Sequence, residues 1–344
     1  MKCLSFYFYL SIALAVSFLW PTSSSAGKDD QADLRKLFER AQNIGDIRAA
    51  GSPGFRMMGD VRLWVKKGTP MQGKYLLIWR PDGNWREELR FNGYKRVRVG
   101  NEKQFWQVRS TETENAQIFG FDEVMNLERG LKIEEGDKLK RLPNGKIDGV
   151  VADCVRHATA GSLPRTYCFS SSSGELLGSR TGSDSMDVPW RVAWEEYSEF
   201  QQWAGKGFPR LLRGFNGKQL VVEVRLDEIT PLPQLPLDYF RPPNDATIWG
   251  HCTGGEMWKL KHSKVPEYPS SERNQGRQGM VSLYARIEDD GHVSNLRLVN
   301  SPDPILGQSA EEAISQWRYE KTAGCLNSTG PAEKLIDVIF SLGR

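Results

Sequence analysis

Apolar residues recur at every second position along several short segments of this 344-residue chain. In residues 55–65, Met57, Val61 and Leu63 fall on one side of an extended segment, while mostly charged residues take the other side. Similar segments follow at 74–79, 85–91, 94–99 and 104–109, and Asn92-Gly93 between two of them is typical of a tight hairpin turn. The pattern restricts this part of the chain to an antiparallel β-sheet with one buried face.

Further strands are expected at 150–158, 166–169, 190–197, 211–215 and 220–226. Many short strands separated by Gly, Asn and Pro turns indicate a curved or barrel-like sheet. Two segments have helical spacing instead: Leu34 to Ile44, with Asp33 as the expected N-cap, and Phe119 to Leu131.

A proline-rich stretch at 230–247 is the expected linker, and we place the domain boundary between residues 243 and 244. Beyond it, strands are expected at 281–287 and 293–299, around an Asp290-Gly291 turn. The alternation slips between Val293 and Leu296, which indicates either a bulge or a strand that starts late. A helical stripe from Leu306 to Trp317 and a last strand over 334–342 complete a small domain. The predicted fold class is therefore α+β, with a curved antiparallel sheet in 27–243 and a small α+β domain in 244–344.

The first 26 residues have the pattern of a signal peptide. Lys2 precedes an uncharged apolar run over 4–19, and Ser24-Ser25-Ala26 offers a small-residue cleavage site. Cleavage after Ala26 would make the protein periplasmic or secreted. The alternative is an uncleaved inner-membrane anchor, although Pro21 ends the run before the ~20 residues that a spanning helix needs.

Export would leave four cysteines in a compartment that permits disulfides. Cys154 and Cys168 are equally far from Gly161, where a turn is expected, so they should face each other across a hairpin. The remaining pair, Cys252 and Cys325, would then form the second disulfide.

The C-terminal pattern resembles the C-terminal domain of the energy transducer TonB. The matching residues are Tyr268-Pro269, Gly279 and Val281, Asp290-Gly291 and Val293, Trp317-Arg318-Tyr319 and Phe340. We interpret the triplet as the end of a helix, where Trp317 closes the apolar stripe, Arg318 points to water and Tyr319 begins a turn. The chain departs from the family's transducers in having Ser270-Ser271 after Tyr-Pro and no long Pro-rich spacer, which argues against energy transduction.

The strand patterns of the N-terminal region are weakly similar to the half-barrel of the lipoprotein carriers LolA and LolB. That resemblance implies a curved sheet wrapped around helices, with an apolar interior that can hold acyl chains. An ordinary sheet core would produce the same pattern, so both readings remain open.

Composition and motifs exclude several function classes. The near-neutral balance of 46 basic and 43 acidic residues argues against nucleic-acid binding. The four histidines have no metal-ligand spacing, and no nucleophile elbow, phosphate loop or dinucleotide fingerprint occurs. We therefore expect no enzyme, no cofactor and no metal.

The expected role is an envelope binding or coupling protein, linked to outer-membrane transport through its C-terminal domain. The alternative is a carrier of lipid or lipoprotein acyl chains. In the resembled family the last strand adds a peptide from the transporter's N-terminus, which implies a partner-binding edge here: Leu335, Ile336, Asp337, Val338 and Ile339. This edge could instead be covered by the N-terminal domain or by a second copy of the chain, and the sequence leaves the oligomeric state open.

Overall fold

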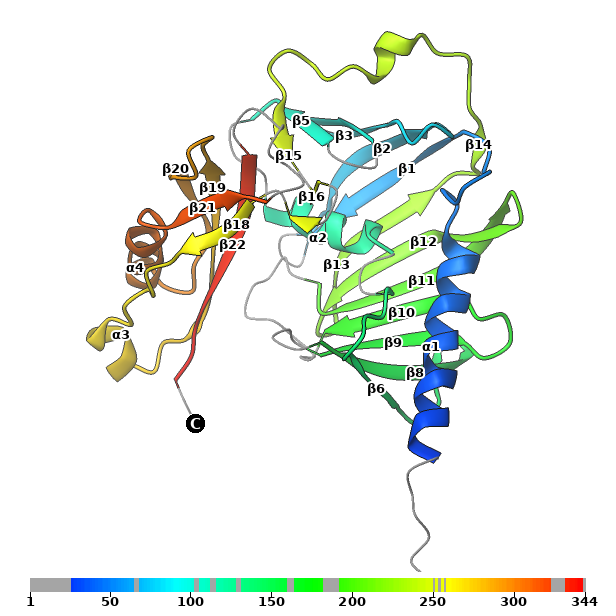
Figure 1. Cartoon of the computed structure of the whole chain (residues 1–344), viewed down its shortest axis with the longest axis horizontal. Helices are drawn as coiled ribbons and strands as arrows, with labels where there is room; N and C mark the ends of the chain where they lie inside the picture. Colours follow the sequence, from blue (N-terminus) through cyan, green and yellow to red (C-terminus); the bar gives the residue numbers. More distant parts are fainter. Residues whose placement is uncertain are drawn as a thin grey trace, which may run out of the picture.

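The computed structural model describes residues 26–64, 68–101, 105–111, 116–127, 131–159, 164–181, 192–249, 251–252, 255–256, 258–322 and 332–342. Its two largest hydrophobic cores among these residues lie one in each predicted domain. Figure 1 shows a large curved sheet with α1 lying across its strands, beside a smaller body that contains α4. The predicted α+β class is confirmed.

The described residues of the N-terminal domain form two helices and most of the strands. Its elements are α1 (Ala26–Gly45), β1 (Phe55–Leu63), β2 (Met71–Trp79), β3 (Trp85–Phe91), β4 (Tyr94–Gly100), β5 (Phe105–Arg109), α2 (Ala116–Met125), β6 (Lys138–Arg141), β7 (Gly145–Ile147), β8 (Val150–Ala158), β9 (Arg165–Ser170), β10 (Leu176–Thr181), β11 (Trp194–Trp203), β12 (Lys206–Asn216) and β13 (Gln219–Leu226).

The remaining elements connect to and build the C-terminal domain. They are β14 (Thr230–Pro231), the 3-10 helix η1 (Leu237–Phe240), β15 (Thr247–Trp249), β16 (His251–Cys252), β17 (Gly255–Glu256), β18 (Trp258–His262), α3 (Ser270–Asn274), β19 (Gly279–Ile287), β20 (Val293–Asn300), α4 (Pro304–Ile314), β21 (Arg318–Lys321) and β22 (Ala332–Phe340). Among the described helices, none is both long and apolar enough to cross a bilayer.

The described strands pair in an order that runs through both domains. From β6 and β7, which both pair with β8, the sheet continues through β9, β10, β11, β12, β13, β1, β2, β3, β4 and β5, and then through β15 to β22, β19 and β20. These pairings are antiparallel except the one between β15 and β22. β18 and β21 form a separate two-stranded sheet.

The N-terminal core follows the predicted periodicities. Strand β1 alternates between buried and exposed residues along its whole length. Helix α1 buries Leu34, Phe38 and Ala41 at helical spacing against the inner face of the sheet. The predicted N-cap at Asp33 is wrong, because α1 already begins at Ala26. Tertiary hydrogen bonds explain the longer helix: the Gln31 side chain bonds the backbone of Leu139 in both directions.

The predicted linker at 230–247 is held against the N-terminal domain. Its first residues form β14, which pairs with β1, and β15 at its end pairs with β5. Between these strands, the guanidinium of Arg86 lies 4.7 Å from the ring centroid of Tyr239, and that of Arg80 lies 5.3 Å from the ring centroid of Phe240. The domain boundary at 243/244 stays a prediction.

In the C-terminal domain, the predicted bulge in β20 is confirmed. The register with β19 shifts between Tyr284 and Arg286, and Asn295 opposite has a φ of 46°. The prediction that Trp317-Arg318-Tyr319 ends a helix is wrong, because α4 ends at Ile314 and the last two residues of the triplet begin β21. Pairing with β18 makes this segment extended, and it buries Tyr319 where a turn was expected. Trp317 does pack against the core, and Arg318 is exposed as expected.

The predicted disulfide between Cys154 and Cys168 is present and joins directly paired residues of β8 and β9. The second predicted disulfide, between Cys252 and Cys325, involves side chains that the structure does not describe. The predicted hairpin turn at Gly161 also lies outside the described residues.

Candidate functional site

Strand β22 contains all five residues of the predicted partner-binding edge. It pairs with β19 along its whole length, from Ala332 opposite Ile287 to Phe340 opposite Gly279. On its other side, β15 pairs with it at Ala332. Among the described strands, none pairs with that side from Glu333 to Phe340, so the backbone there can accept an added strand.

The two faces of β22 have different surroundings. On one face, Ile336 and Phe340 are buried in the core beneath α4. On the other face, Leu335 packs beside Tyr284, and Asp337 accepts a hydrogen bond of 2.6 Å from the Ser282 hydroxyl. Val338 is half-buried and belongs to the first face. Ile339, near the end of the strand, is 65% exposed.

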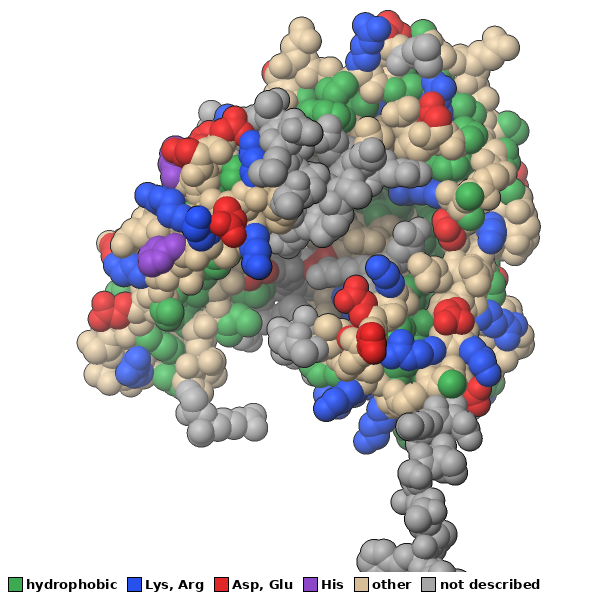
Figure 2. All heavy atoms as spheres, in the orientation of Figure 1, with side chains coloured by type: hydrophobic (Ala, Val, Ile, Leu, Met, Phe, Trp, Pro, Cys, Tyr) green, Lys and Arg blue, Asp and Glu red, His purple; other side chains and the backbone are tan. Residues whose placement is uncertain are grey.

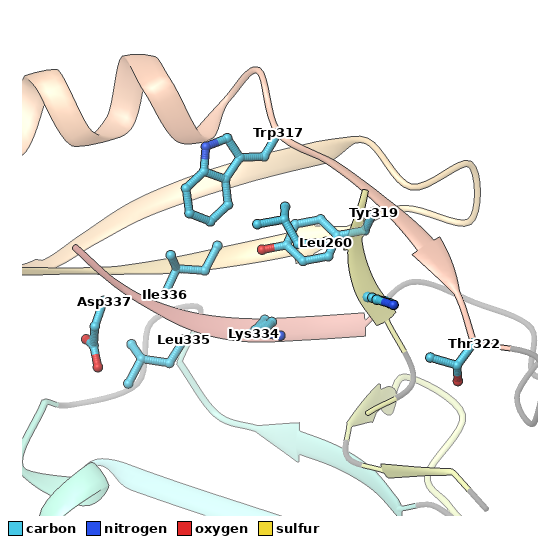
Figure 3. A pocket seen from close by; sticks show the side chains of 9 residues that line it. Leu260, Trp317, Tyr319, Thr322, Lys334, Leu335, Ile336 and Asp337 are labelled. Carbon is cyan, nitrogen blue, oxygen red and sulfur yellow. The ribbon is translucent and has the colours of Figure 1, made fainter. Parts of the chain in front are cut away.

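A groove of about 460 Å³ lies beside β22. Its lining residues come from β18, β21 and β22, from the turn after α4 and from the position after β21: Lys259, Leu260, Trp317, Tyr319, Thr322, Lys334, Leu335, Ile336 and Asp337. Figure 3 shows Trp317, Leu260 and Ile336 on one side of β22, with Leu335 and Asp337 on the other. The volume is within the range of sites that bind small groups and side chains.

The aromatic wall of the groove is held in place by the neighbouring backbone. The indole Nε1 of Trp317 donates a 2.8 Å hydrogen bond to the carbonyl of Lys264. The ring centroids of Trp317 and Tyr319 are 6.5 Å apart, and the ammonium of Lys334 lies 5.6 Å from the centroid of the Tyr319 ring. Leu260 leaves 39% of its surface exposed at the groove. The groove thus offers an apolar wall with Lys259 and Lys334 beside it.

The start of β22 is joined to the N-terminal domain by a buried ion pair. The guanidinium of Arg109, from β5, donates to both carboxylate oxygens of Glu333 at 2.8 and 3.1 Å, and to the hydroxyl of Tyr284 at 2.6 Å. The ring of Tyr284 also packs on Phe119 of α2, with centroids 6.1 Å apart. Sequence patterns did not single out Arg109, and its partner lies 224 residues away.

Helix α2 is itself anchored by a second set of ion pairs. Asp122 accepts hydrogen bonds from Arg96 at 2.6 and 2.9 Å and from Arg98 at 3.0 and 2.9 Å. Burial acts to raise the pKa of Asp122, but the two guanidinium groups outweigh it and leave that pKa below its ordinary value. The carboxylate of Asp122, which anchors α2 to β4, is therefore ionised at neutral pH.

The inner face of the N-terminal sheet holds a small cavity of about 120 Å³, lined by Met57, Tyr75, Leu77 and Glu87 among others. This is below the lower bound of about 300 Å³ for typical ligand pockets. Phe38, Tyr167 and Phe169 fill neighbouring space with edge-to-face ring contacts. The described residues offer no cluster of three or more metal-ligating side chains.

Residues 264–328 match the family model described as the Gram-negative bacterial TonB protein C-terminal. The resemblance read from the sequence is therefore confirmed over this segment. The comparison with curated proteins found no match.

Three solved structures illustrate the structural similarities. The Pseudomonas aeruginosa TonB C-terminal domain is 20% identical, covers 26% of this chain and 92% of its own, and has a TM-score of 0.23. A LolA superfamily protein from Nitrosomonas europaea is 12% identical over 60% of this chain and 96% of its own, with a TM-score of 0.39. The Pseudomonas aeruginosa MucA/MucB complex is 10% identical over 76% of this chain and 83% of that one, with a TM-score of 0.27.

Proposed function

We propose that this chain is an exported, non-catalytic binding protein of the cell envelope, and that it recognises an extended peptide of an envelope partner along β22. One observation carries the proposal: the edge of β22 from Glu333 to Phe340 has no paired strand among the described residues. The family match to the TonB C-terminal domain supports the envelope location and the protein partner. The link to outer-membrane transport follows from the resemblance to that family.

The groove supplies a reason for selectivity. An added strand would hydrogen-bond to the backbone of β22, and its alternate side chains would point to opposite faces. Those on the groove side would meet Trp317 and Leu260, while those on the other side would meet Leu335 and Asp337. The backbone supplies affinity, and these two sets of contacts would select the sequence of the peptide.

The alternative role as an acyl-chain carrier stays a prediction. It requires an apolar cavity on the inner face of the N-terminal sheet; one cavity among the described residues there has a volume of about 120 Å³ and is lined partly by Glu87 and Tyr75. Co-purified lipid detected by mass spectrometry of the native protein would support it.

The test uses the full chain and synthetic peptides that match the N-terminal segments of outer-membrane transporters. Fluorescence anisotropy should identify a binding peptide, and N-methylation of alternate amides should then weaken binding at one set of positions only. Each lost main-chain hydrogen bond should cost about 1 kcal/mol, or about fivefold in Kd. Modifying the peptide leaves the fold of the protein untouched.

A matching change in the protein is Ile339→Pro, which removes one backbone donor from β22. Ile339→Thr is the control because it keeps the N–H group and β propensity at this exposed position. Equal weakening by N-methylation at every position, or tight binding by a folded proline variant, would contradict the edge-strand site.

A further inference from the structure

The small cavity on the inner face of the N-terminal sheet combines an apolar wall with a few polar groups. The apolar wall comes from β1, β2, β12 and the end of α2: Met57, Leu77, Phe208, Met125 and Leu127. The polar groups are those of Tyr75, Glu87, Arg48 and Asn126. A volume of about 120 Å³ admits only a molecule well below the size of the ligands that fill pockets of about 300 Å³ or more.

Tyr75 contributes a hydroxyl group without a protein partner. Its side chain is 3% exposed, and its ring packs on Phe121 of α2 with the centroids 5.5 Å apart. Tyr75 lines the cavity, and within the described part of the chain its hydroxyl makes no hydrogen bond. Burial first, and the charge of Glu87 second, raise the pKa of Tyr75, so the hydroxyl keeps its proton at neutral pH. Since buried polar groups are nearly always hydrogen-bonded, we expect an acceptor in the cavity.

Glu87 lines the same cavity with a carboxylate that is only half used. It lies directly opposite Leu77 and diagonal to Tyr75 across the β2–β3 pair, within reach of the same ligand. Its Oε1 accepts a hydrogen bond of 3.2 Å from Arg96 and lies 3.5 Å from a guanidinium nitrogen of Arg98. Among the described residues, none donates to Oε2. This oxygen can therefore accept a hydrogen bond from a ligand.

Arg48 supplies the opposite charge at the cavity. Other basic side chains lie among acidic ones: Figure 2 shows the two kinds interspersed over this face, and Arg225 pairs with Glu199. Arg48 is exposed, and no carboxylate of the described residues lies within 4 Å of its guanidinium. After burial and Glu87, its charge is the next influence on the pKa of Tyr75, which it lowers. A guanidinium in this position can bind the carboxylate of a ligand through two parallel hydrogen bonds.

We propose that this cavity binds a small free amino acid, with the ammonium group on Glu87 and the carboxylate on Tyr75 and Arg48. A short side chain lies against Met57 and Leu77. Glu87 disfavours an anion without an ammonium group, and Arg48 disfavours a cation without a carboxylate, so the two charges together select a zwitterion. The inference is independent of the proposed function of β22.

The test is isothermal titration calorimetry of the full chain with L-alanine. Propionate, which lacks the ammonium group, and ethylamine, which lacks the carboxylate, are titrated for comparison. We expect L-alanine to bind with a Kd below about 1 mM, and each of the two fragments to bind about tenfold more weakly or less. L-Tryptophan should not bind, because its side chain is too large for the cavity.

Two substitutions test the location of the site without removing a contact of the folded protein. Tyr75→Phe removes a hydroxyl that has no protein partner, and Arg48→Gln removes an exposed charge that has none. Each should weaken L-alanine binding about tenfold and leave thermal unfolding without ligand unchanged. The matched controls, Tyr239→Phe and Arg56→Gln, remove the same groups outside the cavity and should bind like the parent.

Four results would overturn the proposal. Equal binding of L-alanine and either fragment would show that the site does not recognise a zwitterion. No heat of binding from any of these compounds at millimolar concentration would mean that the cavity holds water only. Binding of L-tryptophan as tight as that of L-alanine, or parent-like binding of L-alanine by either folded variant, would place the site elsewhere.

Discussion

The guanidinium of Arg109 donates two hydrogen bonds, of 2.8 and 3.1 Å, to the carboxylate of Glu333 across the junction between the two domains. Both side chains are nearly buried, with 8% and 14% of their surfaces exposed. Because Glu333 is the first residue of β22 beyond the pairing with β15, this contact sets where the candidate binding edge begins. The position of the edge therefore depends on the N-terminal domain.

The first prediction follows from the burial of this ion pair. Arg109→Leu or Glu333→Leu alone should destabilise the junction by about 3 kcal/mol, because each leaves one buried charge without its main partner. The double variant should be more stable than either single variant, since both charges are then gone. Calorimetric unfolding of the four proteins measures this, and additive losses would show that the two residues act separately.

The second prediction concerns acid. Since the pKa of Asp122 is lowered in the folded state, its ion pairs stabilise the protein above the unfolded pKa of about 3.9 and lose this effect as the pH falls through the folded pKa. The unfolding free energy of the parent should therefore drop below about pH 4. Asp122→Asn should make the loss of unfolding free energy at low pH smaller, whereas Asp245→Asn, at an exposed position, should leave that loss unchanged. Urea unfolding over a pH series measures the slopes.

The third prediction concerns the disulfides. Cys154→Ser with Cys168→Ser opens a loop with a sequence separation of 14 and should cost about 3 kcal/mol in the chain-entropy description. Urea unfolding should show the same loss when the parent is reduced. Non-reducing peptide mapping tests the second pair, and a peptide that links Cys154 to Cys252 or Cys325 would disprove the predicted pairing.

Local patterns were sufficient for elements whose partners lie nearby in the sequence. The alternation of β1, the bulge in β20 and the disulfide between Cys154 and Cys168 were all predicted correctly. Each depends on a side-chain period or a short hairpin, which a single sequence reveals. The same reasoning missed β10, because its first four residues are buried on both faces and show no alternation.

Strands whose partners lie far away in the sequence could not be predicted from local patterns. The local pattern around Tyr319 predicts the end of a helix. Tyr319 is a strand residue because it pairs with β18, about sixty residues earlier in the sequence. The groove beside β22 exists because of this pairing, since Leu260 and Tyr319 line it together. The contact between Arg109 and Glu333 also joins residues that no local period connects. The edge strand itself came from the family resemblance, and its binding role stays a prediction.

The fourth prediction concerns the N-terminus. Cleavage after Ala26 should leave Gly27 as the first residue of the exported protein, because Ala26 closes the small-residue site. Intact-mass measurement of envelope-fraction protein tests this. A protein that keeps Met1 would establish the anchor alternative.

The last prediction separates the groove from the backbone edge. Leu260 lines the groove and is 39% exposed, so Leu260→Glu should change folding stability by less than about 1 kcal/mol. The same change puts a carboxylate where an apolar side chain of the bound peptide would lie against Trp317, and should weaken peptide binding about tenfold. Leu298→Glu is the matched control, because Leu298 is 46% exposed and lies on β20, on the far side of β19 from β22. Anisotropy titrations of the three proteins measure the difference. If Leu260→Glu binds the peptide as tightly as the control, side chains in the groove do not contribute, and recognition rests on the β22 backbone alone.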